Sequence, residues 1–290
     1  MSLTLVPLRT LGFVLCLLGC HAMCRIGETV MPRGARSGLL PAVGKFWCRL
    51  CALILGLWVT WVKEEGPGGG KGDAPPGAVA AGLISNHGSW ADILIHLGRY
   101  WCSFAARDGT QDLMMIGYIS SRMLQCVYVN RLKSTSASSQ GVSAQIKQRM
   151  LAKASPQSDD TDRLMLLFPE GTTTNGKYLL PFKTGAFLAG VPLQPVIIKY
   201  HGTAFSPTWD TINVFRQIWL LMCQPITHIT CVELAVYHPS EEEKSDPALY
   251  AENMRQYMIK YSKLKPSEAS FASKMEYHRA IEAAEKAKRH

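Results

Sequence analysis

The sequence is poor in charged residues, and acidic residues are fewer than basic ones. Charged residues make up 18% of the 290 positions and hydrophobic residues 47%, whereas soluble domains are typically about 25% charged. A chain this apolar is not a long disordered protein. Its net charge of +9 favours anionic partners such as lipid headgroups or phosphorylated cofactors. No nucleic-acid motif or dense Lys/Arg tract accompanies that charge, so we expect no nucleic-acid partner.

The sequence also lacks Asn-x-Ser/Thr glycosylation sites and has an odd number of cysteines, nine. Both features favour a reducing, cytosol-facing protein over a disulfide framework. Cys20, Cys24, Cys48 and Cys51 offer four thiolates that zinc could bind. We interpret them instead as small apolar residues of membrane helices and expect no metal site.

Two common catalytic loops are missing. The stretch GPGGGKGDAPPG at 66–77 contains a Gly-Lys pair, but Gly72 stands where a phosphate-binding loop needs Ser or Thr. Its composition predicts a linker instead. No Gly-x-Ser-x-Gly elbow occurs, so a serine nucleophile lacks its usual support.

Two apolar runs, at 10–24 and 46–62, precede the linker. Full spanning needs about 20 apolar residues, so two spans, a re-entrant hairpin and a cleaved signal peptide with Arg9 as its basic region all stay open. The basic stretch between the runs would lie against anionic headgroups, in the cytosol by the positive-inside rule. A hairpin that returns to its side of entry keeps the remaining chain there too. We therefore expect residues 1–65 to anchor the protein in a membrane.

Beyond the linker, apolar strand-like runs alternate with amphipathic stretches. Strands are predicted at 78–85, 126–129, 164–168, 195–200 and 228–237, and helices at 90–100 and 140–153. This alternation predicts an α/β fold with a mostly parallel sheet wrapped by helices. We assign 78–240 to this domain and 241–290 to a charged helical tail on its surface.

His87 and Asp92 lie in the sequence NHGSWAD, directly after the first predicted strand. Histidine suits a general base because its pKa lies near working pH. A carboxylate on its other ring nitrogen would set the tautomer and stabilise the imidazolium. An isolated pair at this spacing is also typical of a helix-capping histidine.

A second constellation, FPEGTTTNG, ends the strand at 164–168. Its concentrated backbone amides and hydroxyls suit a phosphate, whereas Glu170 suits a substrate hydroxyl or a basic neighbour. Arg131 follows the strand at 126–129, where its guanidinium would bind a phosphate bidentately. Lys183, in PFKTGAF, would meet the phosphates of CoA or extend its ammonium into solvent.

Taken in order, these blocks resemble the glycerolipid acyltransferase family. The resemblance rests on His87 and Asp92, on Arg131, on FPEGT and on VPLQPVII at 191–198, and it covers about residues 5–260. Within the family, NHGSWADIL, CVYVNR and LFPEGTTTNGKYLLPFKTGAFLAGVPLQPVIIKY look most similar to the lysophosphatidylethanolamine acyltransferases of plants and algae. Lysophosphatidylcholine acyltransferases come next. The EF-hand repeats of some relatives have no counterpart here, so calcium regulation is not expected.

The resemblance implies roles for these residues and a membrane-embedded N-terminal helical hairpin. His87 and Asp92 would be catalytic, and Pro195 would shape the site. The substrate-binding residues would be Arg131, Glu170, Gly171, Thr172 and Lys183. Acyl-CoA would be a co-substrate, with no bound cofactor, and the family implies the endoplasmic reticulum membrane with the site facing the cytosol.

The sequence therefore predicts an acyl-CoA-dependent enzyme that re-acylates lysophosphatidylethanolamine and other lysophospholipids. Transfer to glycerol 3-phosphate or 1-acylglycerol 3-phosphate is an alternative within the same family. A membrane or lipid-droplet scaffold without activity and a lipid or thioester hydrolase are alternatives of other classes.

Overall fold

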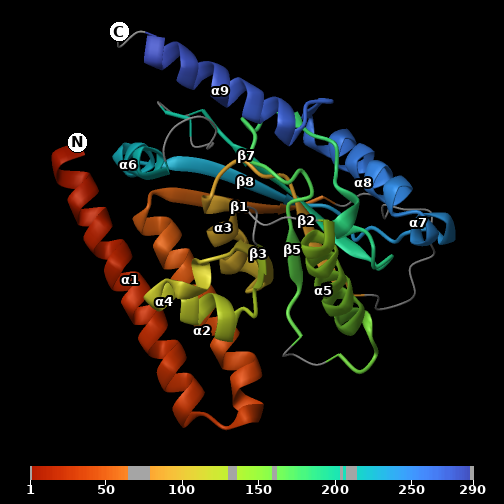
Figure 1. Ribbon diagram of the computed structural model, residues 1–290. Helices are drawn as coiled ribbons and strands as arrows, with labels where there is room; N and C mark the ends of the chain where they lie inside the picture. Colours follow the sequence, from red (N-terminus) through yellow and green to blue (C-terminus); the bar gives the residue numbers. More distant parts are fainter. Residues whose placement is uncertain are drawn as a thin grey trace.

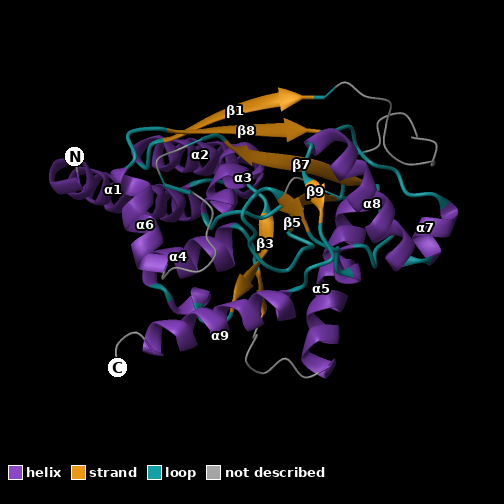
Figure 2. Ribbon diagram, turned by 90° about the horizontal axis from the view of Figure 1, so that it is seen from above, coloured by secondary structure: helices purple, strands orange, loops and turns teal. Residues whose placement is uncertain are grey.

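The computed structural model describes residues 2–64, 79–129, 136–158, 162–202, 205–206 and 214–287. The linker predicted at 66–77 and Arg131 therefore lie outside the described residues. Helices pack on both faces of a seven-stranded sheet (Figures 1 and 2).

The sheet is mixed but mostly parallel. Its strand order is β1-β8-β7-β2-β5-β3-β4. Among its described strands, β7 and β8 pair antiparallel and the other neighbours pair parallel. These strands are β1 (Leu57–Lys63), β2 (Gly82–Ser85), β3 (Ser103–Arg107), β4 (Val127–Val129), β5 (Met165–Leu167), β7 (Leu193–Tyr200) and β8 (Thr227–Glu233). A separate parallel pair joins β6 (Tyr178–Leu179) to β9 (Lys265–Pro266). The predicted α/β class is confirmed.

Strands β2 and β5 are short apolar runs because they lie in the middle of the sheet and are covered on both faces. Every residue of both strands is buried. Successive side chains point to opposite faces, so Leu83 joins the core beneath α2 and α3 whereas Ile84 joins the core beneath α5 and α8. Strand β2 runs parallel to β5 on one side and to β7 on the other. All three strands therefore end at the same edge.

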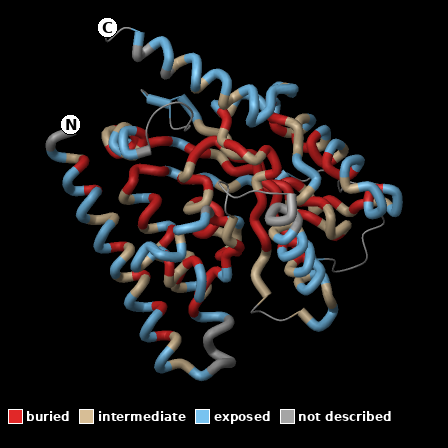
Figure 3. The backbone as a smooth tube through the Cα atoms, viewed as in Figure 1, coloured by how far each residue is buried: buried red, intermediate tan, exposed pale blue. Residues whose placement is uncertain are grey.

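The helices cover the sheet and extend beyond it. They are α1 (Ser2–Val30), α2 (Arg33–Ile54), α3 (Ala91–Tyr100), α4 (Met114–Tyr118), α5 (Ser136–Ala154), α6 (Val214–Cys223), α7 (Glu241–Ser245), α8 (Pro247–Ser262) and α9 (Phe271–Ala287). Short turns of helix lie at Thr110–Asp112, Ile119–Met123 and Thr184–Ala186. Buried residues concentrate at the sheet, whereas α9 is mostly exposed and α1 alternates between buried and exposed residues (Figure 3).

Helix α1 is fixed to the sheet domain at one of its faces. The buried guanidinium of Arg9 donates to the carbonyl oxygens of Met222 at 2.8 Å and Pro225 at 2.5 Å, and also to that of Gln224. It thereby satisfies carbonyl groups at the C-terminal end of α6, which have no partner within that helix. Arg9 is thus a structural contact of the folded domain.

The opposite face of α1 is apolar and uncovered. Leu8, Leu11, Leu15 and Leu18 are all exposed along it, and the helix runs along the flank of the molecule (Figure 1). Within the described part of the chain, Thr4–Val30 is a helix long and apolar enough to cross a membrane.

The prediction of one membrane segment over 46–62 is wrong in its second half. Helix α2 ends at Ile54, and residues 57–63 form strand β1, which pairs with β8 along its whole length. Gly56 separates the two elements in a left-handed conformation, with φ +78°, which glycine adopts without steric cost. The sequence shows a single apolar run because the end of α2 and strand β1 are both apolar.

The prediction of a surface tail from residue 241 also needs correction. Helix α8 buries Tyr250, Met254 and Met258 completely against the core that contains β2 and β7. These residues are four apart and form one apolar stripe, which the charges on the other faces of the helix obscured. The folded domain therefore continues to the end of α8.

Candidate active site

The first part of the site is set by the residue that follows β2. The side-chain amide of Asn86 donates to the carbonyl of Ile198 at 3.0 Å, and its oxygen accepts from the Ile198 amide at 2.7 Å. A side chain thus continues the pairing of β2 with β7 for one more step. The backbone of β2 is then free to turn, and His87 lies at that turn.

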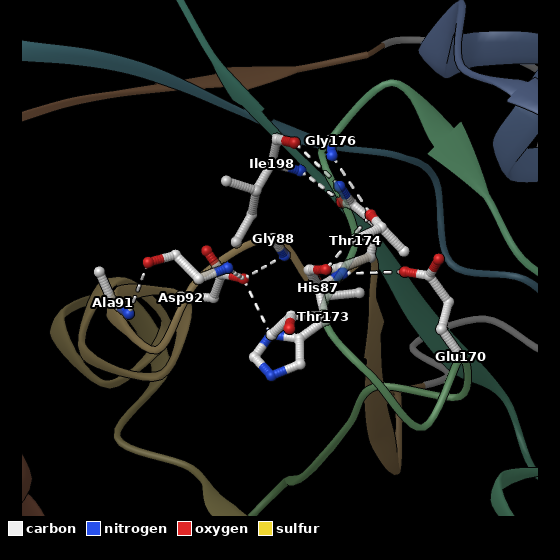
Figure 4. Close-up of polar contacts among 12 residues, drawn as sticks. His87, Gly88, Ala91, Asp92, Glu170, Thr173, Thr174, Gly176 and Ile198 are labelled. Atoms are coloured by element: carbon white, nitrogen blue, oxygen red, sulfur yellow. Dashed lines mark hydrogen bonds and ion pairs between the residues drawn. The ribbon is translucent and has the colours of Figure 1, made fainter. Parts of the chain in front are cut away.

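His87 and Asp92 are in contact, as the spacing predicted. Their Nδ1 and Oδ2 atoms are 2.9 Å apart. The same carboxylate oxygen accepts from the amide of Gly88 at 2.7 Å (Figure 4) and from that of Ser89 at 2.9 Å. Its other oxygen, Oδ1, accepts from the hydroxyl of Tyr200. Asp92 is completely buried. Four converging donors fit an ionised carboxylate, which can only accept.

This arrangement sets the chemistry of the imidazole. An ionised Asp92 requires the proton on Nδ1 of His87, which leaves the Nε2 lone pair free to accept another. The imidazole stacks on Phe168, with centroids 4.0 Å apart and planes 17° from parallel. The side chain keeps 18% exposure. His87 is therefore held by two neighbours and remains open to a reactant.

Glu170 joins the second constellation to the first. It is buried, and its Oε1 and Oε2 accept from the backbone amides of His87 and Leu180, both at 3.0 Å. Thr174 adds a bond from its own amide to the carbonyl of His87 at 2.8 Å. The loop after β5 is therefore bonded to the backbone of His87 on both sides. In this structure Glu170 positions the loop, and its role in substrate binding stays a prediction.

Gly171 and Lys183 lie together in the same loop region. Gly171 has φ +69°, and a Cβ atom there would come within 2.6 Å of Lys183 Nζ. The lysine side chain therefore occupies the space in which any residue other than glycine at position 171 would place its Cβ atom. Thr172 is buried beside them and lines a cavity of about 250 Å³. Substrate contacts by these three residues stay predictions.

Pro195 lies inside the sheet, opposite Ile84 of β2. Its carbonyl accepts from the amide of Leu234 at 3.1 Å. Proline has no N–H to return that bond, and the side-chain amide of Gln194 donates to the Leu234 carbonyl instead, at 2.5 Å. Pro195 thus occupies the end of the β7–β8 ladder, three residues before the Ile198 that pairs with Asn86. Its influence on the site is through the position of β7.

Tyr200 is a site residue that the sequence did not indicate. Burial and the charge of Asp92 raise the pKa of its phenol well above the usual value, so the phenol stays protonated and donates a hydrogen bond to Asp92. The available signal was its position at the carboxyl end of β7, where parallel strands gather functional side chains. That signal needs the strand order, which one sequence does not show.

The pKa of Glu170 predicts how stability depends on pH. Burial raises that pKa to about 7, and the bonds from Leu180 and His87 only partly oppose the shift. The native state therefore holds a proton that the unfolded chain, with a pKa near 4.5, has already released. Stability should fall as pH rises from about 4.5 to 7, by up to ~3 kcal/mol.

The test compares the thermal unfolding of detergent-solubilised wild type and Glu170→Gln. The Gln variant loses this titration, so the advantage of wild type over it should be larger at pH 5 than at pH 7.5. The exposed Glu241→Gln on α7 is the matched control. A difference between wild type and Glu170→Gln that does not vary with pH would contradict the raised pKa.

Known proteins resemble this chain across its length. The Acyltransferase family model matches residues 77–199. Lysophospholipid acyltransferase LPEAT1 of Arabidopsis thaliana is 36% identical over 96% of this chain and 78% of its own length. Lysophosphatidylcholine acyltransferase 1 of Danio rerio is 33% identical over 73% of this chain and 39% of its own length.

A solved structure, the 1-acyl-sn-glycerophosphate acyltransferase PlsC from Thermotoga maritima, aligns with a TM-score of 0.49 and 15% identity. That alignment covers 86% of this chain and 97% of the other. The Arabidopsis relative is similar over most of both chains, and the family model spans the segment that carries His87, Asp92 and Glu170. The chain is an acyltransferase and belongs to the Acyltransferase family.

Proposed function

We propose that this acyltransferase moves a fatty acyl group from acyl-CoA to the free hydroxyl of a lysophospholipid. The observation that carries the proposal is the His87–Asp92 pair at the edge where β2, β5 and β7 end. Nε2 of His87 has no hydrogen-bond partner among the described residues. The names of the relatives point to lysophospholipids as acceptors. Among lysophospholipids, we propose lysophosphatidylethanolamine as the preferred acceptor because of the sequence resemblance, with lysophosphatidylcholine second.

The proposed reaction is one direct transfer. As the acceptor hydroxyl forms its C–O bond to the thioester carbonyl, Nε2 of His87 takes the hydroxyl proton. Asp92, held by its other donors, stabilises the imidazolium that results. The C–S bond then breaks, and the imidazolium returns the proton to the departing sulfur of CoA. No acyl-enzyme is needed.

We also propose that α1 binds a membrane through its exposed leucine face. Its opposite face is occupied by the bonds of Arg9 to the end of α6 and by packing against α2. A helix attached in this way to the catalytic domain fits insertion from one side better than a full span. The membrane we propose is that of the endoplasmic reticulum, with the site facing the cytosol.

Removal of the base should abolish transfer. With labelled oleoyl-CoA and a panel of lysophospholipids, His87→Ala should lower the rate by about 10²–10⁴-fold. The exposed His228→Ala is the matched control and should behave as wild type. Free fatty acid that forms regardless of acceptor would indicate a hydrolase. Transfer only to glycerol 3-phosphate or 1-acylglycerol 3-phosphate would show that the acceptor is one of these molecules and not a lysophospholipid. No transfer by the wild type to any acceptor would favour a membrane scaffold without activity.

Tyr200→Phe should reduce kcat by on the order of tenfold, because one charge-assisted hydrogen bond to Asp92 is lost. Asp92 would keep its bonds to His87, Gly88 and Ser89 but would lose the donor from β7 that helps to fix it beside the imidazole. Steady-state kinetics should show the loss in kcat with the KM values little changed, and thermal unfolding should show a Tm near that of wild type. A kcat equal to that of wild type would contradict this role of Tyr200, and a loss of activity that follows a fall in Tm would mean that Tyr200 serves only the fold.

Charges on the outer face of α1 should weaken membrane binding, since a lysine there would enter apolar lipid. The double variant Leu11→Lys/Leu15→Lys should co-sediment with phosphatidylcholine–phosphatidylserine vesicles several-fold less than wild type. Leu249→Lys places a charge on the exposed face of α8 and is the control. Equal co-sedimentation of the double variant and wild type would refute the proposed membrane face.

A further inference from the structure

A buried arginine of helix α8 lies behind the loop that carries Glu170. The side chain of Arg255 is 4% exposed, and its guanidinium donates to the carbonyls of Leu179 at 3.4 Å and Ser267 at 3.0 Å. Leu179 ends strand β6, and Ser267 follows strand β9. Arg255 therefore attaches the small β6–β9 pair to α8. The match to the family model ends at residue 199 and assigns this arginine no role.

The charge of Arg255 is only partly neutralised by its carboxylate partners. Glu252 lies 3.3 Å from the guanidinium and Glu268 3.1 Å, and their side chains are 49% and 83% exposed. Water screens such exposed carboxylates, whereas the protein interior screens the buried guanidinium much less. Its Nε is buried and has no hydrogen-bond partner among the described residues. The positive charge therefore acts on other buried groups nearby.

One peptide group connects Arg255 to Glu170. The carbonyl of Leu179 accepts from the guanidinium, and the N–H of the same peptide, which belongs to Leu180, donates to Oε2 of Glu170 at 3.0 Å. The peptide dipole thus has its oxygen end at the cation and its N–H end at the carboxylate. Hydrogen bonds aligned in this way strengthen one another. The amide of Ser267 donates to the same carbonyl at 3.2 Å and helps to hold the peptide in place.

Glu170 carries this connection to the catalytic histidine. Its Oε1 accepts from the backbone amide of His87 at 3.0 Å (Figure 4). Each carboxylate oxygen therefore accepts one N–H. This arrangement suits the ionised form, because a protonated carboxyl group carries a donor on one of its oxygens. Ionised Glu170 thus holds the backbone of His87 more firmly than the neutral acid would.

The charges near Glu170 decide how far it is ionised at neutral pH. Burial raises its pKa to about 7, the charge of Asp92 on α3 also raises it, and the charge of Arg255 on α8 lowers it. The titratable side chains of His87 and Lys183 lie at the same loop. Without the positive charge of Arg255, the pKa of Glu170 would rise further, and the carboxyl group would be mostly protonated at pH 7.

We propose that Arg255 is a positioning residue of the active site, whose charge keeps Glu170 ionised through the peptide of residues 179–180, so that Glu170 holds the backbone of His87. The inference rests on the proposed role of His87 as general base. It gives helix α8 a part in catalysis in addition to its part in the core. Arg255 acts from behind the loop, through Glu170, without touching the substrate.

The kinetic test measures kcat against pH at saturating substrate. Arg255→Gln removes the charge but can still donate to a carbonyl. The acidic limb of the profile should move to higher pH by about one unit, and kcat at pH 7 should fall about fivefold. In a Glu170→Gln background the same substitution should leave the limb in place. An equal shift in that background would mean that the charge acts without Glu170, and no shift in either background would mean that it does not act at all. Both results would overturn the proposal.

Other variants separate charge from packing. Arg255→Lys keeps the charge, so its acidic limb should stay near that of wild type even if kcat falls. The double variant Glu252→Gln/Glu268→Gln changes exposed side chains only and therefore tests the proposal even if Arg255→Gln does not fold. It removes negative charge beside the arginine, so the limb should move to lower pH by about 0.3 units. The exposed Glu241→Gln on α7 is the matched control and should leave the limb unchanged. An unmoved limb in the double variant, or one at higher pH, would contradict the proposal.

Thermal unfolding follows Glu170 without catalysis and so separates this inference from the proposed function. The difference in Tm between Arg255→Gln and Arg255→Gln/Glu170→Gln should keep changing to a pH about one unit higher than the difference between wild type and Glu170→Gln. Such a shift would support the action of Arg255 on Glu170 even if no lysophospholipid were acylated. If acyl transfer proceeds but both differences end their change at the same pH, the role of Arg255 is overturned and the proposed function stands.

Discussion

The structure depends on the parallel pairing of β2 with both β5 and β7. Because the three strands run in the same direction, their last residues meet at one edge. His87 follows β2, Glu170 follows β5 and Tyr200 ends β7, so residues from three distant parts of the chain converge at this edge. Asn86 completes this arrangement, since its amide pairs with Ile198 where the β2 backbone leaves the sheet. A shift in the register of any one of these strands would separate the base from its partners.

The buried carboxylate of Asp92 is the second determinant. A buried charge is costly unless hydrogen bonds satisfy it, and four donors from its own turn and from β7 do so here. The same donors hold it rigid beneath His87. The imidazolium that forms during transfer would therefore meet a fixed negative charge, with little reorganisation during the reaction. Phe168 and Glu170 restrain the ring and the backbone of His87, so orientation is set before any substrate binds.

The two ends of the chain extend this centre in different ways. At the N-terminus, α1 has one face bonded to the catalytic domain through Arg9 and one face of exposed leucines. The helix that carries the proposed membrane face is therefore also a packed element of the folded domain. At the C-terminus, α8 completes the core and α9 forms a wall beside the loop that positions the base.

Local sequence signals were enough for the α/β class, most of the strands around the site and the contact of His87 with Asp92, because each depends on residues a few positions apart. They also indicated FPEGT as a site loop. Tertiary structure alone decided that residues 57–63 are a strand, that α8 belongs to the core, and that Tyr200 contacts Asp92. Those outcomes depend on which strands become neighbours and which helix face is covered. Both are settled by packing between segments distant in the chain, which no local period or motif encodes.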